Sequence, residues 1–204
     1  CLRPGLALPP ESAAGDAHAL RPRRPHRLHH GLQQRADAKI PLVAAAAGVP
    51  IVKHGNRSVS SRSGSADVLE ALGIRLPQTP EDAQALFSAA KFTFLFAPHF
   101  HPAMKAIAPV RRALGIRTVF NLLGPLTNPA APPFGLIGAC DLPTARLLAD
   151  ALAGMPIQRA FVVHGDPGWD EATPVGPFTV FDVRPGVVRR GRRDPAHYGI
   201  PRCT

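Results

Sequence analysis

Cations, hydroxyls and glycines gather in one turn of the chain, over residues 53–67. This turn lies between an apolar run that ends at Val52 and a second one that follows Asp67. A turn that joins a strand to the start of a helix directs backbone N–H groups, and a partial positive charge, at whatever it encloses. The chemistry that these residues favour is therefore the binding of an anion such as phosphate or pyrophosphate. Serine- and glycine-rich connections are usually only solvated loops, so the composition alone leaves that simpler interpretation open.

The elements that position this turn are predicted from apolar periodicity and from turn residues. We expect helices over residues 42–47, 66–72, 80–90, 102–114 and 143–153. We expect strands over residues 51–53, 92–96, 118–121, 134–138, 160–164 and 178–183, the last of them pairing with 187–190. Thr79 is suited to cap the helix that begins at Pro80. Strands that alternate with helices predict an α/β fold with a largely parallel sheet flanked by helices.

Three segments in this order closely resemble the anthranilate phosphoribosyltransferase family. The first is Lys-His-Gly-Asn-Arg-Ser-x-Ser-Ser-x-x-Gly-Ser-Ala-Asp at residues 53–67. The second, over residues 94–129, contains Ala-Pro-His-Phe-His-Pro and Asn-Leu-Leu-Gly-Pro-Leu-Thr-Asn-Pro. The third joins Val-Val-His-Gly at 162–165 to Trp-Asp-Glu-Ala-Thr-Pro at 169–174. The resemblance covers about residues 42–202 and implies a catalytic domain like those of phosphoribosyltransferases and nucleoside phosphorylases. It also implies transfer of the phosphoribosyl group from phosphoribosyl pyrophosphate (PRPP) to anthranilate, a step of tryptophan biosynthesis.

The resemblance also implies roles for individual residues, although no catalytic residue is assigned from it. The positions matching the PRPP site are Lys53, Asn56, Arg57, Ser58, Ser61 and Ser65. Those matching the anthranilate site are His54, Asn56, His101 and Arg111. The adjacent carboxylates that match a Mg²⁺ site are Asp170 and Glu171.

Each of these positions has a simpler interpretation. Ser65 could serve as the N-cap of the following helix, and Arg111 could be a cation on a helix surface. A histidine near apolar sequence is more often a structural residue, and adjacent carboxylates are common on surfaces. A nucleoside phosphorylase is a weaker enzymatic alternative.

The two ends of the chain depart from the family pattern. No Gly-Thr-Gly-Gly-Asp sequence is present, and Arg35, Asp37 and Ala38 stand where the family has Asn, Ser and Thr. The first residue is Cys1, and the chain stops at Thr204. We therefore expect residues 1–39 to be a disordered or foreign basic segment, for which a shifted reading frame is one hypothesis. Residues 40–204 would form a partial catalytic domain whose N-terminal helical domain is missing. Turnover by this chain would be low, and the family's homodimer would be doubtful.

Charge is unevenly distributed over the chain, whose formal net charge is +10. Residues 1–39 and 182–204 contribute +4 each, and the centre contributes only +2. A basic chain can bind nucleic acid, and a non-catalytic nucleic-acid-binding relative is the alternative function. Because the centre of the chain is nearly neutral, we do not expect nucleic acid to be a partner. No apolar run approaches a membrane span, and the three scattered cysteines form no paired framework. These features favour a cytoplasmic protein without a membrane partner.

Overall fold

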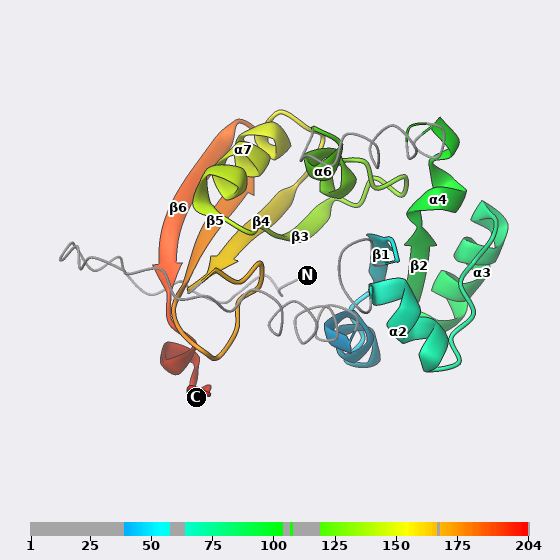
Figure 1. Ribbon diagram of the computed structural model, residues 1–204, viewed down its shortest axis with the longest axis horizontal. Coiled ribbons are helices and arrows are strands. Elements are labelled where there is room, and N and C mark those ends of the chain that lie inside the picture. The colour runs from blue at the N-terminus through cyan, green and yellow to red at the C-terminus, as the bar shows by residue number, and fades with distance from the viewer. Residues whose placement is uncertain (1–38, 58–63, 104–106, 108–118, 167, 204) are drawn as a thin grey trace. The chain divides into compact units, whose positions relative to one another are not determined.

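The computed structural model describes residues 39–57, 64–103, 107, 119–166 and 168–203 (Figure 1). The described residues divide into two compact units, over residues 39–133 and 134–203, and each is described by itself. Within these ranges, no helix is long and apolar enough to cross a membrane. Residues 1–38 lie outside the described residues, so the expectation of a disordered or foreign segment there stays a prediction. The expectation of a single partial catalytic domain over residues 40–204 also stays a prediction.

The first unit is built on a pair of parallel strands, β1 (Ile51–Gly55) and β2 (Phe92–Phe96). Ile51 lies opposite Phe92 and Gly55 lies opposite Phe96, so the carboxyl ends of the two strands coincide. The helices and turns of this unit are a helix over residues 39–46, α2 (Ser65–Ala71), α3 (Pro80–Ala90), α4 (Ala97–Phe100), α6 (Phe120–Leu123) and the 3-10 turn η1 (Gly124–Leu126). The pair β1–β2 and the adjacent α3 are visible in Figure 1.

Strand β2 forms the centre of this unit because all five of its residues are buried. Its three phenylalanines join Ala66, Leu69 and Leu76 in one apolar cluster. Helix α3 begins as predicted, since the Thr79 hydroxyl accepts a hydrogen bond from the Asp82 N–H at 3.2 Å. The helix ends at Ala90 and is followed by Lys91, the C-cap residue, which takes up a left-handed conformation with φ of 55°. The predicted helix 80–90 and strand 92–96 are therefore confirmed at their bounds.

The strand predicted over residues 118–121 is wrong. Helix α6 occupies residues 120–123, and the Leu123 N–H donates to the Val119 carbonyl at 3.1 Å. Periodicity cannot distinguish a short apolar run in a strand from one in a helical turn. Here Pro125 lies in the first turn of η1, which directly follows α6, so the backbone remains helical after the apolar run. The predicted helix over 102–114 lies mostly outside the described residues.

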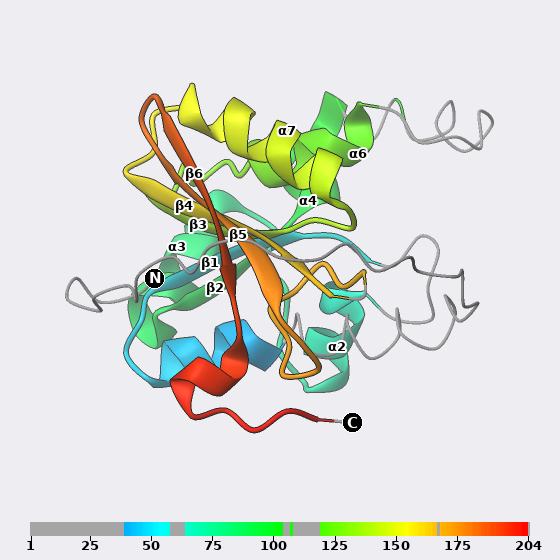
Figure 2. The same cartoon turned by 90° about the vertical axis from the view of Figure 1, so that its left-hand side faces the viewer.

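The second unit is a four-stranded sheet in the order β3-β4-β5-β6. Its elements are β3 (Phe134–Gly138), α7 (Leu142–Ala153), β4 (Arg159–Gly165), β5 (Phe178–Arg184), β6 (Val187–Arg193) and the 3-10 helix η2 (Pro195–Tyr198). Strands β3 and β4 are parallel, whereas β5 and β6 return as an antiparallel hairpin. Helix α7 packs on β4 and β5, as Figure 2 shows. The α/β class is confirmed, with one parallel and one mixed sheet.

Candidate functional site

The turn identified in the sequence leaves β1 at the carboxyl end of the parallel pair. In α/β folds this is the edge of the sheet where ligands bind. Gly55, the last residue of β1, lies close to the start of α2. A Cβ atom at Gly55 would be 3.1 Å from Cζ of Phe94 and 3.2 Å from Oγ of Ser65. The absence of a side chain at Gly55 therefore lets the strand end pack against the first residue of α2.

Helix α2 begins with Gly64 as its N-cap, so the interpretation of Ser65 as the N-cap is wrong by one position. Ser65 is the first helical residue and is 7% exposed. Gly64 has no side chain that could cap the helix, but its own N–H donates to Oδ2 of Asp67 at 2.7 Å. The Asp67 carboxylate thus already accepts the hydrogen bond of one backbone amide at the start of α2. Whether Ser65 contacts PRPP stays a prediction.

Arg57 reaches from the turn to the acidic face of α2. Its guanidinium lies 2.7 Å from Oε1 of Glu70 and 3.7 Å from Oδ1 of Asp67, and 5.6 Å from the centre of the Phe96 ring. The Arg57 side chain is 52% exposed. Exposed ion pairs contribute only about 0–1 kcal/mol, so an anionic ligand could displace these carboxylates from the guanidinium.

Asn56 directly follows the carboxyl end of β1, whereas Lys53 lies in the middle of the strand. The side-chain oxygen of Asn56 accepts a hydrogen bond from the Arg57 N–H at 2.7 Å, which fixes the Asn56 amide beside the turn. Lys53 is half-buried in β1, opposite Phe94. The other two serines of the predicted PRPP site, Ser58 and Ser61, lie outside the described residues, as does Arg111.

Two histidines of the predicted anthranilate site meet, although 47 positions separate them. Nε2 of His54 lies 3.0 Å from Nε2 of His101, and the rings cross at 69°. Nδ1 of His54 lies 3.2 Å from the Gly124 carbonyl oxygen. Burial lowers the pKa of His54 below its usual 6.5, and the neighbouring His101 lowers it further, against the opposing effect of the Gly124 hydrogen bond. At pH 6.5 and above, the neutral form of His54 is therefore the favoured one.

The predicted metal ligands, Asp170 and Glu171, lie in the second unit, in the loop that follows β4. This loop is anchored by two hydrogen bonds between the backbones of Gly165 and Trp169, at 2.7 and 2.9 Å. A Cβ atom on Gly138 would collide with the carbonyl oxygen of Asp170, and one on Gly165 with that of Glu171. The acidic loop therefore packs directly against two glycines at the ends of adjacent strands.

The donor atoms of this loop suit a hard cation. Two carboxylates are sufficient protein ligands for Mg²⁺, which keeps several waters and takes phosphate oxygens for the rest. The Thr173 hydroxyl, two residues after Glu171, is buried without a hydrogen-bond partner in the structure. Within the described residues no three His, Cys, Asp or Glu side chains cluster as a complete metal site. The residues present thus fit a magnesium ion that is bound together with a phosphate ligand.

Sequence reasoning missed the two glycines that hold the acidic loop. Their signal was available, because Gly138 is the last residue of one predicted strand and Gly165 directly follows another. A glycine at that position can mark a close approach of another backbone. What the sequence did not indicate is that both approaches involve the same loop.

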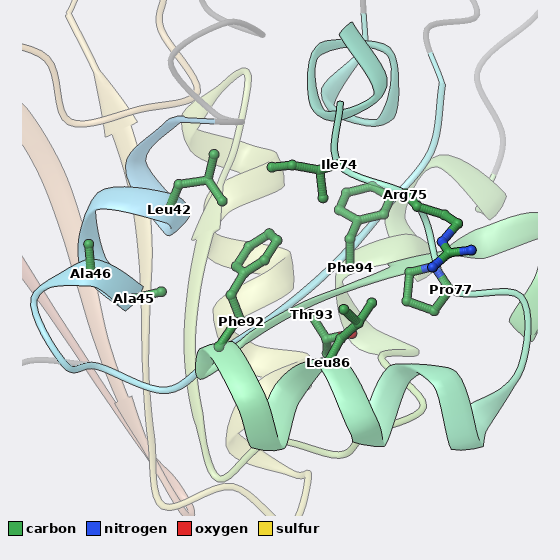
Figure 3. Close-up of a pocket in the computed structure, with 11 residues that line it drawn as sticks. Leu42, Ala45, Ala46, Ile74, Arg75, Pro77, Leu86, Phe92, Thr93 and Phe94 are labelled. Carbon is green, nitrogen blue, oxygen red and sulfur yellow. The ribbon is translucent and has the colours of Figure 1, made fainter. Parts of the chain in front are cut away.

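The first unit also contains a pocket of about 330 Å³, whose lining residues are drawn in Figure 3. Phe92 and Phe94 of β2 line it together with Leu42 and Ile74, and the wall also includes Arg75 and Thr93. Phe92 is the first residue of β2, whereas the candidate site gathers at its carboxyl end. We interpret this pocket as an incompletely filled part of the apolar core.

Comparison with known proteins identifies the family. Residues 38–204 match the family model described as "Glycosyl transferase family, a/b domain". The anthranilate phosphoribosyltransferase of Desulforudis audaxviator is 52% identical over 162 residues, which are 79% of this chain and 47% of that protein. The crystal structure of anthranilate phosphoribosyltransferase from Thermus thermophilus superimposes with a TM-score of 0.74 at 44% identity, covering 84% of this chain and 50% of that one.

A more distant solved structure shows what such a protein binds. Anthranilate phosphoribosyltransferase from Saccharomyces cerevisiae in complex with PRPP and Mg matches with a TM-score of 0.72 at 30% identity, covering 82% of this chain and 46% of the yeast one. The chain spans about half the length of the curated relatives it matches. The predicted resemblance is confirmed by these matches. By its match to that family model over residues 38–204, the chain belongs to the glycosyl transferase family.

Proposed function

We propose that this chain is the α/β part of an anthranilate phosphoribosyltransferase, which transfers the phosphoribosyl group from PRPP to anthranilate in tryptophan biosynthesis. The observation that carries the proposal is the close approach of Gly55, the last residue of β1, to Ser65, the first residue of α2. This approach gathers Asn56, Arg57 and Ser65 at the carboxyl end of the parallel strands. Relatives about half identical to this chain bear the name of that enzyme.

The chemistry of the reaction explains why these residue types are needed. As the bond to pyrophosphate breaks, the anomeric carbon becomes cationic and the leaving group gathers negative charge. Cations held beside the leaving group stabilise that change, and a positioned polar amide orients the two substrates. Arg57 would exchange Glu70 for phosphate oxygens, and Lys53 and Asn56 would add a charge and a hydrogen-bonding amide. The assignments of Ser58, Ser61 and Arg111 rest on the resemblance.

Asp170 and Glu171 are the residues that would hold Mg²⁺ in this proposal. When bound, the ion neutralises phosphate charge and helps the pyrophosphate to leave. The Gly138 and Gly165 contacts support the role of the two acids, because they hold the backbone of the loop in one place.

Binding and turnover test the proposal separately. Adding PRPP and Mg²⁺ to the ¹⁵N-labelled chain should shift the amide signals of Gly55, Asn56, Arg57 and Gly64. Asp170→Asn should weaken that response, whereas Asp150→Asn, which alters an exposed ion pair on α7, should not. Turnover is measured as loss of anthranilate fluorescence. Amides that stay unshifted at millimolar PRPP with Mg²⁺ would rule out this function for the chain.

The alternative of a nucleic-acid-binding protein is less well supported. Four arginines among the described residues of the second unit are engaged with carboxylates: Arg146 with Asp150, Arg159 with Asp182, Arg192 with Asp166, and Arg202 with Asp194. These pairs reduce the positive charge available to a polyanion. We also propose a cytoplasmic location, because the three scattered cysteines of the sequence form no recognisable disulfide framework.

A further inference from the structure

The histidine pair at the end of β1 has a hydrogen-bond pattern that determines its protons. A carbonyl oxygen only accepts, so Nδ1 of His54 must carry the hydrogen that it donates to Gly124. In neutral His54 the other nitrogen, Nε2, then bears a lone pair. The partner across 3.0 Å is Nε2 of His101, which must therefore be the donor. Neutral His101 is left with one lone pair, on Nδ1.

Nδ1 of His101 is the atom through which this pair can take up a proton. The opposite arrangement, in which His54 donates to His101, requires a proton on both nitrogens of His54. Burial opposes that cation, and the lowered pKa of His54 agrees with it. A proton that arrives at Nδ1 leaves the Nε2–H of His101 in place, still donating to His54. The His101 cation is then stabilised by a neutral acceptor that is itself held by Gly124.

The position of the pair suits a role in the proposed transfer. His54 is two residues before Asn56, and His101 follows α4, which begins directly after β2. Both rings thus lie where the two parallel strands end. The reaction requires a proton acceptor, because the amine of anthranilate loses a hydrogen when its nitrogen bonds to carbon.

We propose that His101 accepts this amine proton and that His54 is a positioning residue that orients the His101 ring; the inference rests on the proposed function. The lone pair of the amine nitrogen forms the new bond to C1 of the ribose. The bond from C1 to the pyrophosphate oxygen breaks, and its electron pair leaves on pyrophosphate. The proton shed by the amine passes to Nδ1 of His101 and from there to water. A positioned acid–base residue of this kind typically contributes about 10²–10⁴-fold to a rate.

Other charged groups near the pair come from the strands and helices already described. Lys53 and Arg57 flank His54 in sequence, and Arg57 is held by Asp67 and Glu70. His99 on α4 packs its ring against Phe96, with Nδ1 3.4 Å from the Pro77 carbonyl. Residues 120–126 of α6 and η1 contain no titratable side chain. Of these titratable groups, His54 is the one that the structure shows in contact with the His101 ring.

Nitrogen NMR of the histidines tests the inference without requiring turnover. In the ¹⁵N-labelled chain at pH 7.5, long-range ¹H–¹⁵N spectra should show hydrogen on Nδ1 of His54 and on Nε2 of His101. Anthranilate, added with PRPP and Mg²⁺, should shift Nδ1 of His101 as that atom accepts the amine hydrogen bond. Benzoate, which lacks the amine, should leave this nitrogen unshifted.

Matched variants separate positioning from folding. His54→Phe removes the acceptor and should leave His101 as a mixture of tautomers, whereas His54→Gln retains an acceptor oxygen and should preserve the Nε2–H form. His99→Gln, which lies on α4 two residues before His101 and outside the pair, should change neither spectrum. Reversed tautomers, or an equal shift with benzoate, would overturn the inference. Anthranilate that binds without moving Nδ1 of His101 would overturn the inference alone, whereas failure of anthranilate and PRPP to bind would overturn the proposed function as well.

Discussion

His54 makes the stability of the protein depend on pH because its ring is partly buried. Burial lowers the pKa of folded His54 below 6.5, so in acid the unfolded chain binds a proton more readily than the folded one. The contribution to stability is complete above pH 6.5 and is lost as the pH falls from 6.5 through the lower pKa of the folded state. We expect His54→Gln to reduce this acid-side loss.

The measurement is the free energy of unfolding in urea at pH 8, 6.5 and 5.5. The difference between the native chain and His54→Gln isolates the contribution of this ring from those of the other histidines. His99→Gln serves as the control, because the His99 ring packs on Phe96 and lies outside the pair of His54 and His101. If the difference between the native chain and His54→Gln is the same at all three pH values, the assignment of a lowered pKa to His54 is wrong.

Thr93 buries a hydroxyl that has no hydrogen-bond partner in the structure and is only 3% exposed. An unsatisfied buried polar group costs roughly 1–3 kcal/mol, and valine has nearly the same shape as threonine. We expect Thr93→Val to raise the free energy of unfolding by about 1 kcal/mol. The same change at Thr79 should lower it by about 1 kcal/mol, because it removes the cap of α3. A destabilised Thr93→Val protein would indicate that water in the adjacent pocket satisfies the hydroxyl.

At the scale of elements, the contact between β3 and the acidic loop depends on Gly138. An alanine there would place its methyl group on the backbone oxygen of Asp170, so the loop would have to move. We expect Gly138→Ala to weaken the response to PRPP and Mg²⁺ and to lower the free energy of unfolding by roughly 1–3 kcal/mol, as overpacking does. Trp169, the single tryptophan, lies in this loop, so its fluorescence spectrum should shift.

Gly135→Ala is the matched control on the same strand. A methyl group at Gly135 would meet only the Cβ atom of Ala160, at 3.4 Å. We expect this variant to keep the tryptophan spectrum and the ligand response of the native chain. Equal effects of the two substitutions would mean that β3 responds to any added methyl group and that Gly138 has no special role in placing the loop.

At the scale of the whole molecule, the basic charge lies largely outside the centre of the chain. Residues 1–39 carry +4 of the net +10, and arginines of the second unit pair with aspartates. We expect weak retention on DNA that decreases steeply between about 50 and 200 mM salt. Deleting residues 1–39 should remove most of it. Retention that survives the deletion would favour the nucleic-acid alternative.

Local sequence was sufficient to predict an element wherever that element contains its own capping residues and its own apolar face. Thr79 and Pro80 specified the beginning of α3, and the phenylalanines of β2 specified a buried strand. The turn after β1 was likewise evident from its own composition, and the order of its residue types indicated the family. In these cases the decisive interactions join residues a few positions apart, so their pattern is readable along the chain.

Only the tertiary structure decided which distant groups meet. The β1–β2 register and the path through η1 bring His54, His101 and Gly124 together, and close packing of two backbones places Asp170 and Glu171 on Gly138 and Gly165. The apolar run at 118–121 likewise became a helical turn because the adjoining η1 continues the helical path. The sequence by itself determined the class of fold, most of its elements and the chemical character of the turn. Contacts between residues tens of positions apart depend on how whole elements pack, and that packing leaves no local pattern.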